Sequence, residues 1–216
     1  ITTAENDTIT LRTVNIANIG MKAGNNVVYT DWNGAMTVAG GTGNDRIILD
    51  PLSTNRALEL RARELVYGSG SSARRIAFDD ALNWIEITDS ATSTVLTNPT
   101  GLTWGATSLK LVSDGSINVS NAFLRSPQGH FILDARLGVI GTLNTELEGL
   151  TVVNRSTTTN ADIIVREADG LRVSDGGRSN GGLYSAAGRI DVEMAGSEAL
   201  LSLESGVIEA AAAAQP

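Results

Sequence analysis

The chain has 216 residues, of which 42% are hydrophobic but only 4% aromatic, so an interior must be built from aliphatic side chains. A net charge of -8 without any Lys/Arg run excludes nucleic acid as an expected partner, because phosphate binding needs a basic face. The absence of cysteine excludes disulfides and cysteine-bound metals. No segment approaches the roughly 20 apolar residues of a spanning helix, so we expect no membrane insertion.

A short pattern returns every nineteen residues in the first quarter of the chain. Residues 6–11, 25–30 and 44–49 each begin with Asn-Asp or Asn-Asn and continue into a strand-like segment. A fixed period near twenty, made of a turn followed by a strand, is typical of one coil of a solenoid.

Strand-like segments of the form apolar-x-apolar continue along the whole chain, separated by Gly, Asn, Asp or Ser. Alternation with period two puts the apolar residues inside and the polar residue between them outside. In chain order the predicted strands are marked by Ile9/Leu11, Val14/Ile16, Met36/Val38, Ile47/Leu49, Leu58/Leu60, Ile76/Phe78, Ile85/Ile87, Leu109/Leu111, Ile117/Val119, Phe131/Leu133, Leu150/Val152, Ile163/Val165, Leu171/Val173, Ile190/Val192 and Leu201/Leu203.

The nineteen-residue step also links more distant strands. From Ile47 it reaches Val66 and then Ile85, and it separates residues 170–173 from residues 189–192. Between these regions the spacing widens to 22 residues, from Leu109 to Phe131. A drifting period suits coils whose turns vary in length while their strands stay stacked.

These patterns predict an all-β chain folded as a right-handed parallel β-helix (β-solenoid) of about ten coils, each of roughly 19–22 residues. A β-sandwich is the alternative, but its hairpins would need more Asn-Gly turns than the two present, Asn33-Gly34 and Asn180-Gly181. We expect a single domain over 1–209, with loop excursions near 89–105 and 174–182. Residues 210–216 are expected to form an Ala-rich tail or linker.

Residues 40–48 match the nine-residue pattern G-G-x-G-x-D-x-U-x of calcium-binding β-rolls at every fixed position. The glycines of such a turn let carbonyls and a carboxylate face Ca²⁺. The candidate ligating positions are Asp45, Gly41, Gly43, Asn26 and Asp7, the last two at the equivalent place in the preceding coils. Because Ca²⁺ in such rolls is shared between tandem copies and this chain has one, the alternative is a column of turn side chains that cap backbone groups.

Candidate catalytic groups are few. Carboxylates with basic neighbours occur at Asp79, Asp80, Asp114 and Asp134, near Arg74, Arg75 and Arg136. Their spacing does not place them on one face of adjacent coils, so we expect solvated surface charge and no catalytic residue. His130 is the only histidine, which leaves little for a histidine-based site. Three tryptophans, Trp32, Trp84 and Trp104, could form a sugar-stacking platform, or they could cover the flank or an end of the solenoid.

Residues 115–122 and 188–196 share the unit Gly-x-Ile-x-Val, in which x is any residue. This repeat style resembles filamentous-haemagglutinin-type exoproteins over most of residues 108–209. The first hundred residues are more similar to giant bacterial adhesins that carry RTX-like calcium rolls.

The resemblance implies a non-catalytic structural or adhesive segment of a bacterial cell-surface or secreted protein, and an extracellular or cell-surface location. The expected partners are the chain itself, in end-to-end or lateral assembly into filaments, or other cell-surface and matrix components. Apart from Ca²⁺ we expect no cofactor. The alternative function is that of a β-helix polysaccharide lyase or hydrolase using surface Asp and Arg residues.

Overall fold

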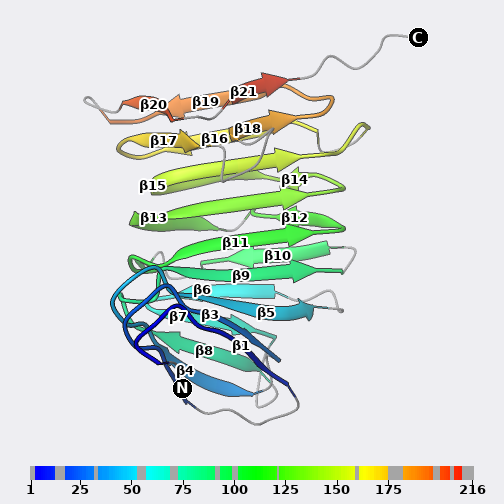
Figure 1. The fold of residues 1–216 in the computed structure, drawn as a ribbon. Coiled ribbons are helices and arrows are strands. Elements are labelled where there is room, and N and C mark those ends of the chain that lie inside the picture. The colour runs from blue at the N-terminus through cyan, green and yellow to red at the C-terminus, as the bar shows by residue number, and fades with distance from the viewer. Residues whose placement is uncertain are drawn as a thin grey trace.

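The computed structural model describes residues 3–12, 18–31, 34–52, 57–68, 73–90, 93–98, 102–120, 122–158, 161–174, 182–196, 200–204 and 207–210. These ranges fold into strands and turns that coil into a parallel β-solenoid of about seven turns (Figure 1). Within them no helix is long and apolar enough to cross a membrane. The fold class predicted from the repeats is confirmed, with about seven turns instead of ten.

Two sheets form the walls of the solenoid. The large sheet has thirteen strands: β1 (Thr8–Leu11), β3 (Val27–Thr30), β5 (Arg46–Leu52), β9 (Trp84–Asp89), β11 (Ser108–Ser113), β13 (Phe123–Ala135), β15 (Thr142–Asn154), β16 (Ile163–Glu167), β17 (Leu171–Ser174), β18 (Gly182–Ser185), β19 (Ile190–Met194), β20 (Leu201–Glu204) and β21 (Val207–Ala210). All of its pairings are parallel. The long strand β15 is followed by β16, β17 and β18 in turn, and these by β19, β20 and β21.

The small sheet has eight strands, in the spatial order β14 (Val139–Ile140), β12 (Ser116–Asn118), β10 (Ser93–Thr97), β6 (Ala57–Arg61), β7 (Glu64–Tyr67), β8 (Arg74–Phe78), β4 (Ala35–Ala39) and β2 (Asn18–Gly20). It is parallel except around β7, which is antiparallel to both β6 and β8. Strands β6, β7 and β8 therefore form a meander inserted into an otherwise parallel ladder.

Two mainly aliphatic columns run along the inner face of the large sheet, each taking one residue from each successive coil. The first column contains Ile9, Val28, Ile47, Ile85, Leu109, Phe131, Leu150, Val173 and Leu203. The second contains Leu11, Thr30, Leu49, Ile87, Leu111, Leu133, Val152, Leu183 and Ile208. Between the end strands the members are at most 2% exposed, and burial of each aliphatic side chain contributes about 1.5–3 kcal/mol.

The meander makes the two walls unequal in length. In the large sheet β5 pairs directly with β9, through Ile47 and Ile85. In the small sheet three strands stand between β4 and β10 over the same part of the chain. The two additional strands make the small sheet about 10 Å longer than the large sheet, and the two sheets face each other at a distance of about 10 Å. The stack therefore bends by about 45° toward the large sheet, and Figure 1 shows β1 and β3 inclined to β9–β15.

Aromatic side chains pack in the interior beside the meander. Trp104 is completely buried, with its ring centroid 4.7 Å from that of Phe78 on β8 and 6.2 Å from that of Phe131 on β13. Its indole nitrogen donates a hydrogen bond of 2.7 Å to the carbonyl of Thr107. These large side chains occupy the region where the two walls diverge, which aliphatic columns alone would fill less completely.

The structure corrects several details of the predicted repeat. Val66 lies on antiparallel strand β7 of the small sheet, so the nineteen-residue step does not make a coil there. Ile190 pairs with Ile163, and Leu171 pairs with Leu201, so residues 170–173 and 189–192 are not neighbours in register. The expected excursion at 89–105 contains strand β10.

Other predictions fall partly or wholly on residues outside the described ranges. These are the strand at Val14/Ile16, the centre of the excursion at 174–182, most of the tail at 210–216, and Trp32.

Candidate functional site

The repeated Asn/Asp positions form a hydrogen-bonded column along one corner of the N-terminal coils. Asp7 donates its backbone N–H to Asn26 Oδ1 at 3.2 Å, and Asn26 donates its own to Asp45 Oδ1 at 3.0 Å. Asp45 in turn donates its backbone N–H to Asn83 Oδ1 at 2.7 Å. Each side chain therefore caps the turn of the preceding coil, and Asn83 is a fourth member that the nineteen-residue spacing did not reveal.

Asn26 and Asp45 are both fully buried and make several hydrogen bonds. The Asn26 amide donates to the carbonyls of Lys22 and Gly24 at 3.0 and 3.1 Å, and to Asp45 Oδ1 at 2.8 Å. Asp45 Oδ2 accepts from the backbone N–H of Gly41 at 2.6 Å. Both carboxylate oxygens of Asp45 thus accept hydrogen bonds from N–H groups of the turn column.

A second asparagine column runs beside the first. Asn25 donates its backbone N–H to Asn6 Oδ1 at 2.7 Å, and Asn44 donates to Asn25 Oδ1 at 2.8 Å. Side chains at both positions of the repeated Asn-Asn or Asn-Asp pair therefore accept hydrogen bonds from backbone N–H groups of the neighbouring coil. This is the capping arrangement given above as the alternative to a calcium site.

The glycines of the nine-residue motif allow these turns to stack closely. A Cβ on Gly41 would lie 2.0 Å from the carbonyl oxygen of Lys22 in the preceding coil. Gly43 has φ of +129°, in the region that favours glycine. The five residues proposed for Ca²⁺ thus lie in consecutive stacked turns. In the described part of the chain, no group of three or more His, Cys, Asp or Glu residues is arranged to hold a metal ion.

The carboxylates proposed for catalysis are distributed over different elements. Asp79 Oδ1 accepts from the backbone N–H groups of Gly40, Ala81 and Leu82, and so caps a turn. Asp80 pairs with Arg63, which lowers the pKa of the Asp80 carboxyl. The structure does not bring these two together in a shared cleft with the remaining candidates.

Those remaining candidates are surface or ion-paired groups. Asp134 on β13 is buried and accepts two hydrogen bonds from Arg155, at 2.8 and 3.0 Å. Asp114 and Arg136 are exposed in turns. Arg75 lies 3.6 Å from Glu64, and the Arg74 guanidinium lies 5.5 Å from the ring centroid of Tyr67.

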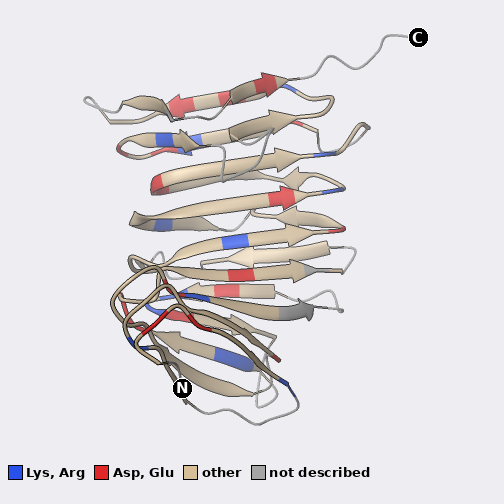
Figure 2. Cartoon of the chain, viewed as in Figure 1, with Lys and Arg blue, Asp and Glu red and all other residues tan. Residues whose placement is uncertain are grey.

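Ion pairs between neighbouring coils neutralise much of the outer face of the large sheet. Glu86 on β9 bridges Arg46 on β5 and Lys110 on β11, at 2.7 and 2.9 Å. Arg172 on β17 pairs with Glu148 on β15 at 2.5 Å. Figure 2 shows acidic and basic residues interspersed along the strands of this wall. This pattern stabilises the stack and gives no large field of one sign.

The lone histidine also belongs to this outer face. His130 Nε2 lies 3.0 Å from Thr151 Oγ1, and the ring centroid lies 6.1 Å from that of Trp84. A Cβ on Gly149 would lie 3.0 Å from His130 Nδ1, so this glycine leaves room for the imidazole. With Trp104 buried inside and Trp84 on the outer face, these two tryptophans do not form a shared sugar-stacking platform, and Trp104 does not cover the flank.

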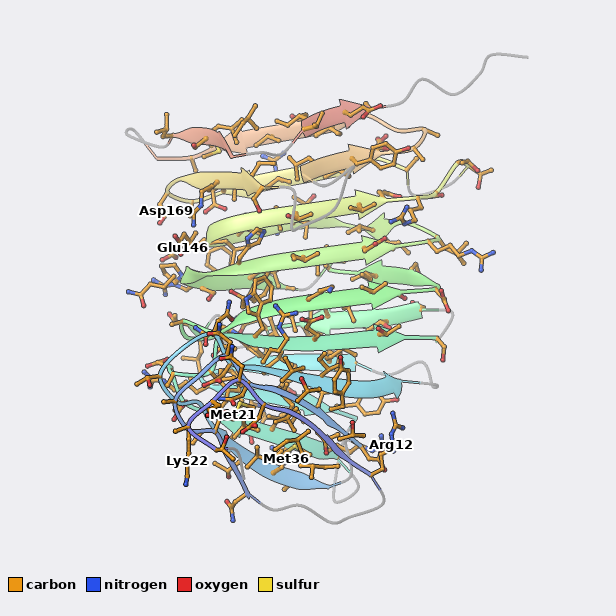
Figure 3. The ribbon with its side chains drawn as sticks, in the orientation of Figure 1. Arg12, Met21, Lys22, Met36, Glu146 and Asp169 are labelled. Atoms are coloured by element: carbon orange, nitrogen blue, oxygen red, sulfur yellow. The ribbon has the colours of Figure 1, made fainter. Side chains whose placement is uncertain are left out.

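An open cleft of about 370 Å³ lies at the edge of the large sheet near its C-terminal end. Its lining includes Glu148, Asp169, Arg172 and Leu200. Figure 3 labels Asp169 and Glu146 at this edge. The cleft combines charged and apolar walls and was not indicated by any sequence motif.

Behind the cleft, Glu167 occupies an interior position at the end of β16 and is fully buried. Its Oε2 accepts from Thr145 Oγ1 at 2.7 Å, and its Oε1 accepts from the backbone N–H groups of Leu147 and Ala168 at 3.3 and 3.1 Å. Burial raises the pKa of Glu167 to about 7, the Thr145 hydrogen bond opposes this rise, and the neighbouring Asp169 adds to it.

The architecture and surface define a parallel β-solenoid with hydrogen-bonded turn columns and cross-coil ion pairs. Comparison of the chain with family models, with curated proteins and with solved structures gives no match. The likeness to surface exoproteins therefore remains a likeness of repeat style.

Proposed function

We propose that the chain is a non-catalytic structural or adhesive segment of a bacterial cell-surface or secreted protein. In this role it provides a stiff rod that joins further copies of itself or other surface and matrix components. The observation that carries the proposal is the apolar, strand-edged surface at the C-terminal end of the stack.

At that end β19, β20 and β21 each pair on one edge only, within the described residues. Unpaired edges with apolar side chains are templates for association. The exposed apolar residues of this end surface are Leu200, Leu201, Leu203, Val207 and Ile208, with exposures between 37% and 71%.

The flanks offer a contrast that favours association through the ends. Charges on the large sheet, such as Glu86 with Arg46 and Lys110, are paired between coils. Tyr29, Leu102 and Leu137 are exposed apolar residues on separate segments, whereas the end surface gathers five such residues on β20 and β21 and directly before β20. A rod with charged sides and an apolar end surface is suited to extended assembly.

Sedimentation velocity and electron microscopy over a wide concentration range test the proposal. We expect concentration-dependent oligomers or filaments, with unchanged far-ultraviolet circular dichroism. Monomers alone at the highest concentration would refute the assembly. Adhesion is tested by measuring whether the labelled chain binds to bacterial surfaces and matrix components. Location is tested by fractionating the source cells and detecting the protein in each fraction with a specific antibody. Recovery in the cytosol would refute the surface assignment.

The cleft beside Asp169 favours a second candidate function, cleavage of a polysaccharide. Glycoside hydrolysis uses two carboxyl groups, one of which has a raised pKa and acts as general acid. Two carboxyl groups, Glu148 and Asp169, line the cleft together with Arg172, whereas Glu167 is buried and does not line it. Release of reducing ends or unsaturated products from a panel of acidic and neutral polysaccharides, abolished by Asp169→Asn, would establish it. No product from any of them would reject it.

A further inference from the structure

We propose that a second copy of this chain docks head to tail on the C-terminal end, with its β1 added as the next parallel strand. In this register Ile9 of the incoming copy follows Leu203, and Leu11 follows Ile208. The inference rests on the proposed end-to-end assembly and adds its polarity and its register.

The two aliphatic columns of the large sheet determine this register. Ile9 and Leu203 are the first and last members of one column, and Leu11 and Ile208 are those of the other. The columns are two residues apart on each shared strand from β1 to β15, and beyond β15 they continue separately, on β17 and β20 and on β18 and β21. A copy that continues both at once therefore has one lateral position, because a shift by one residue would place Thr10 over an apolar neighbour.

The column members at the two ends of the described stack are more exposed than those inside it. Leu203 and Ile208 are 56% and 39% exposed, whereas Val173 and Leu183, directly beneath them, are both fully buried. Ile9 and Leu11 are half-buried at the opposite end. When β1 stacks on the C-terminal end, the four side chains of Ile9, Leu11, Leu203 and Ile208 become covered. Each then contacts an apolar side chain of the neighbouring strand, as the column members inside the stack do.

Charge favours head-to-tail docking over contact between two C-terminal ends. The outward residues of the last coil include Asp191, Glu193 and Glu209, and Figure 2 shows acidic residues on β19 and β21. Two such ends would repel each other. The outward residues of β1 are Thr8 and Thr10, which carry no charge.

Basic and acidic residues both lie near β1. Arg12 and Lys22 lie at the N-terminal end of the stack, as Figure 3 labels them. Glu5, Asp7 and Asp31 lie at the same end, and Asp31 is 4.0 Å from Arg12. The preference for head-to-tail docking therefore comes from the uncharged outward face of β1.

The absence of cysteine permits a direct test of the register by cross-linking. Thr8 and Ser202 belong to one outward column, which also passes through Arg46 and Arg172. In the docked pair their Cα atoms are expected about 4.8 Å apart, within the range of a disulfide. The offset pair of Thr10 and Ser202 would be about 8 Å apart, beyond that range.

We expect Thr8→Cys/Ser202→Cys to oxidise into a ladder of linked oligomers, at least tenfold faster than Thr10→Cys/Ser202→Cys. A mixture of the Thr8→Cys and Ser202→Cys single variants should give mixed dimers only. Equal rates for the two double variants, or rapid dimerisation of either single variant, would overturn the register or polarity while leaving assembly itself intact. Monomers in every variant and in the unmodified protein would overturn the proposed assembly as well.

A charge substitution provides a second readout that leaves the interior unchanged. Leu203→Asp should raise the concentration needed for half-maximal association at least tenfold. The matched control is Leu137→Asp, because Leu137 is 51% exposed but lies in a turn on the flank. Equal effects of the two substitutions, with circular dichroism unchanged, would contradict docking through the end surface.

Discussion

The substitution Glu167→Gln tests whether a buried carboxyl group makes the C-terminal coils sensitive to pH. Glu167 projects into the interior from β16, beneath Met194 of β19 in the strand register. Glutamine has nearly the same shape and keeps an oxygen to accept from the Leu147 N–H, but it cannot ionise. The variant therefore removes the titration with little change in packing.

The expected magnitude follows from the two pKa values. The pKa of Glu167 is about 7 in the folded protein and 4.5 for an ordinary glutamate, and its first cause is burial. Between these values the folded state keeps a proton that the unfolded state has lost. The free energy of unfolding therefore has this contribution in full below pH 4.5 and loses it as pH rises through 7, by about 3 kcal/mol in total.

Urea denaturation of both proteins at pH 5, 6, 7 and 8 measures this difference. We expect the wild-type midpoint to fall relative to that of Glu167→Gln between pH 5 and 8, with unchanged slope. Glu5→Gln, at an exposed carboxylate, is the control and should follow the wild type. Parallel pH profiles for wild type and Glu167→Gln would show that the reasoning about burial is wrong.

Three further predictions concern the interior and the turn columns. Trp104→Ala should lower the free energy of unfolding by about 3–5 kcal/mol, because it leaves a cavity in the interior. Trp84→Ala on the outer face should lower it by about 1 kcal/mol. Equal losses would contradict the packing role of the buried indole. Asn26→Asp should cost about 3 kcal/mol at pH 7, because it places a second carboxylate against Asp45 and removes the three hydrogen bonds that the Asn26 amide donates. Exposed Asn44→Asp should have little effect in the same denaturation assay. The melting temperature should be the same in EDTA and in millimolar calcium, because both Asp45 carboxylate oxygens already accept hydrogen bonds from N–H groups. A rise of several degrees in calcium would instead establish a calcium site at the turn column.

The strands and their inward faces could be predicted because the repeat leaves a local record in the sequence. Ile47 and Leu49 flank an outward residue, and so do Leu109 and Leu111, and each of these four residues is buried. The turn column could also be anticipated, since Asp7, Asn26 and Asp45 recur at a fixed spacing. Alternation and spacing are properties of neighbouring residues, and a sequence displays them directly.

The meander could not be predicted, because strand direction depends on which partner a segment meets. Ile76 and Phe78 on β8 have the same apolar alternation as the coil strands, yet β8 pairs antiparallel with β7. Asn83 likewise joins the turn column 38 residues after Asp45, twice the usual step, because the meander occupies the intervening length. The cleft at Asp169 and the ionisation of Glu167 depend on contacts between coils, which no single segment records.

The unequal walls have a consequence for any polymer of this protein. If copies add head to tail, each brings its own meander, so the axis turns by about 45° at every subunit. About eight subunits would then complete one revolution, and the right-handed twist of the sheets would displace successive revolutions along an axis. The product would be a wound spring-like fibre instead of a straight needle, with the large sheets lining its inner surface and the meanders spaced along its outside.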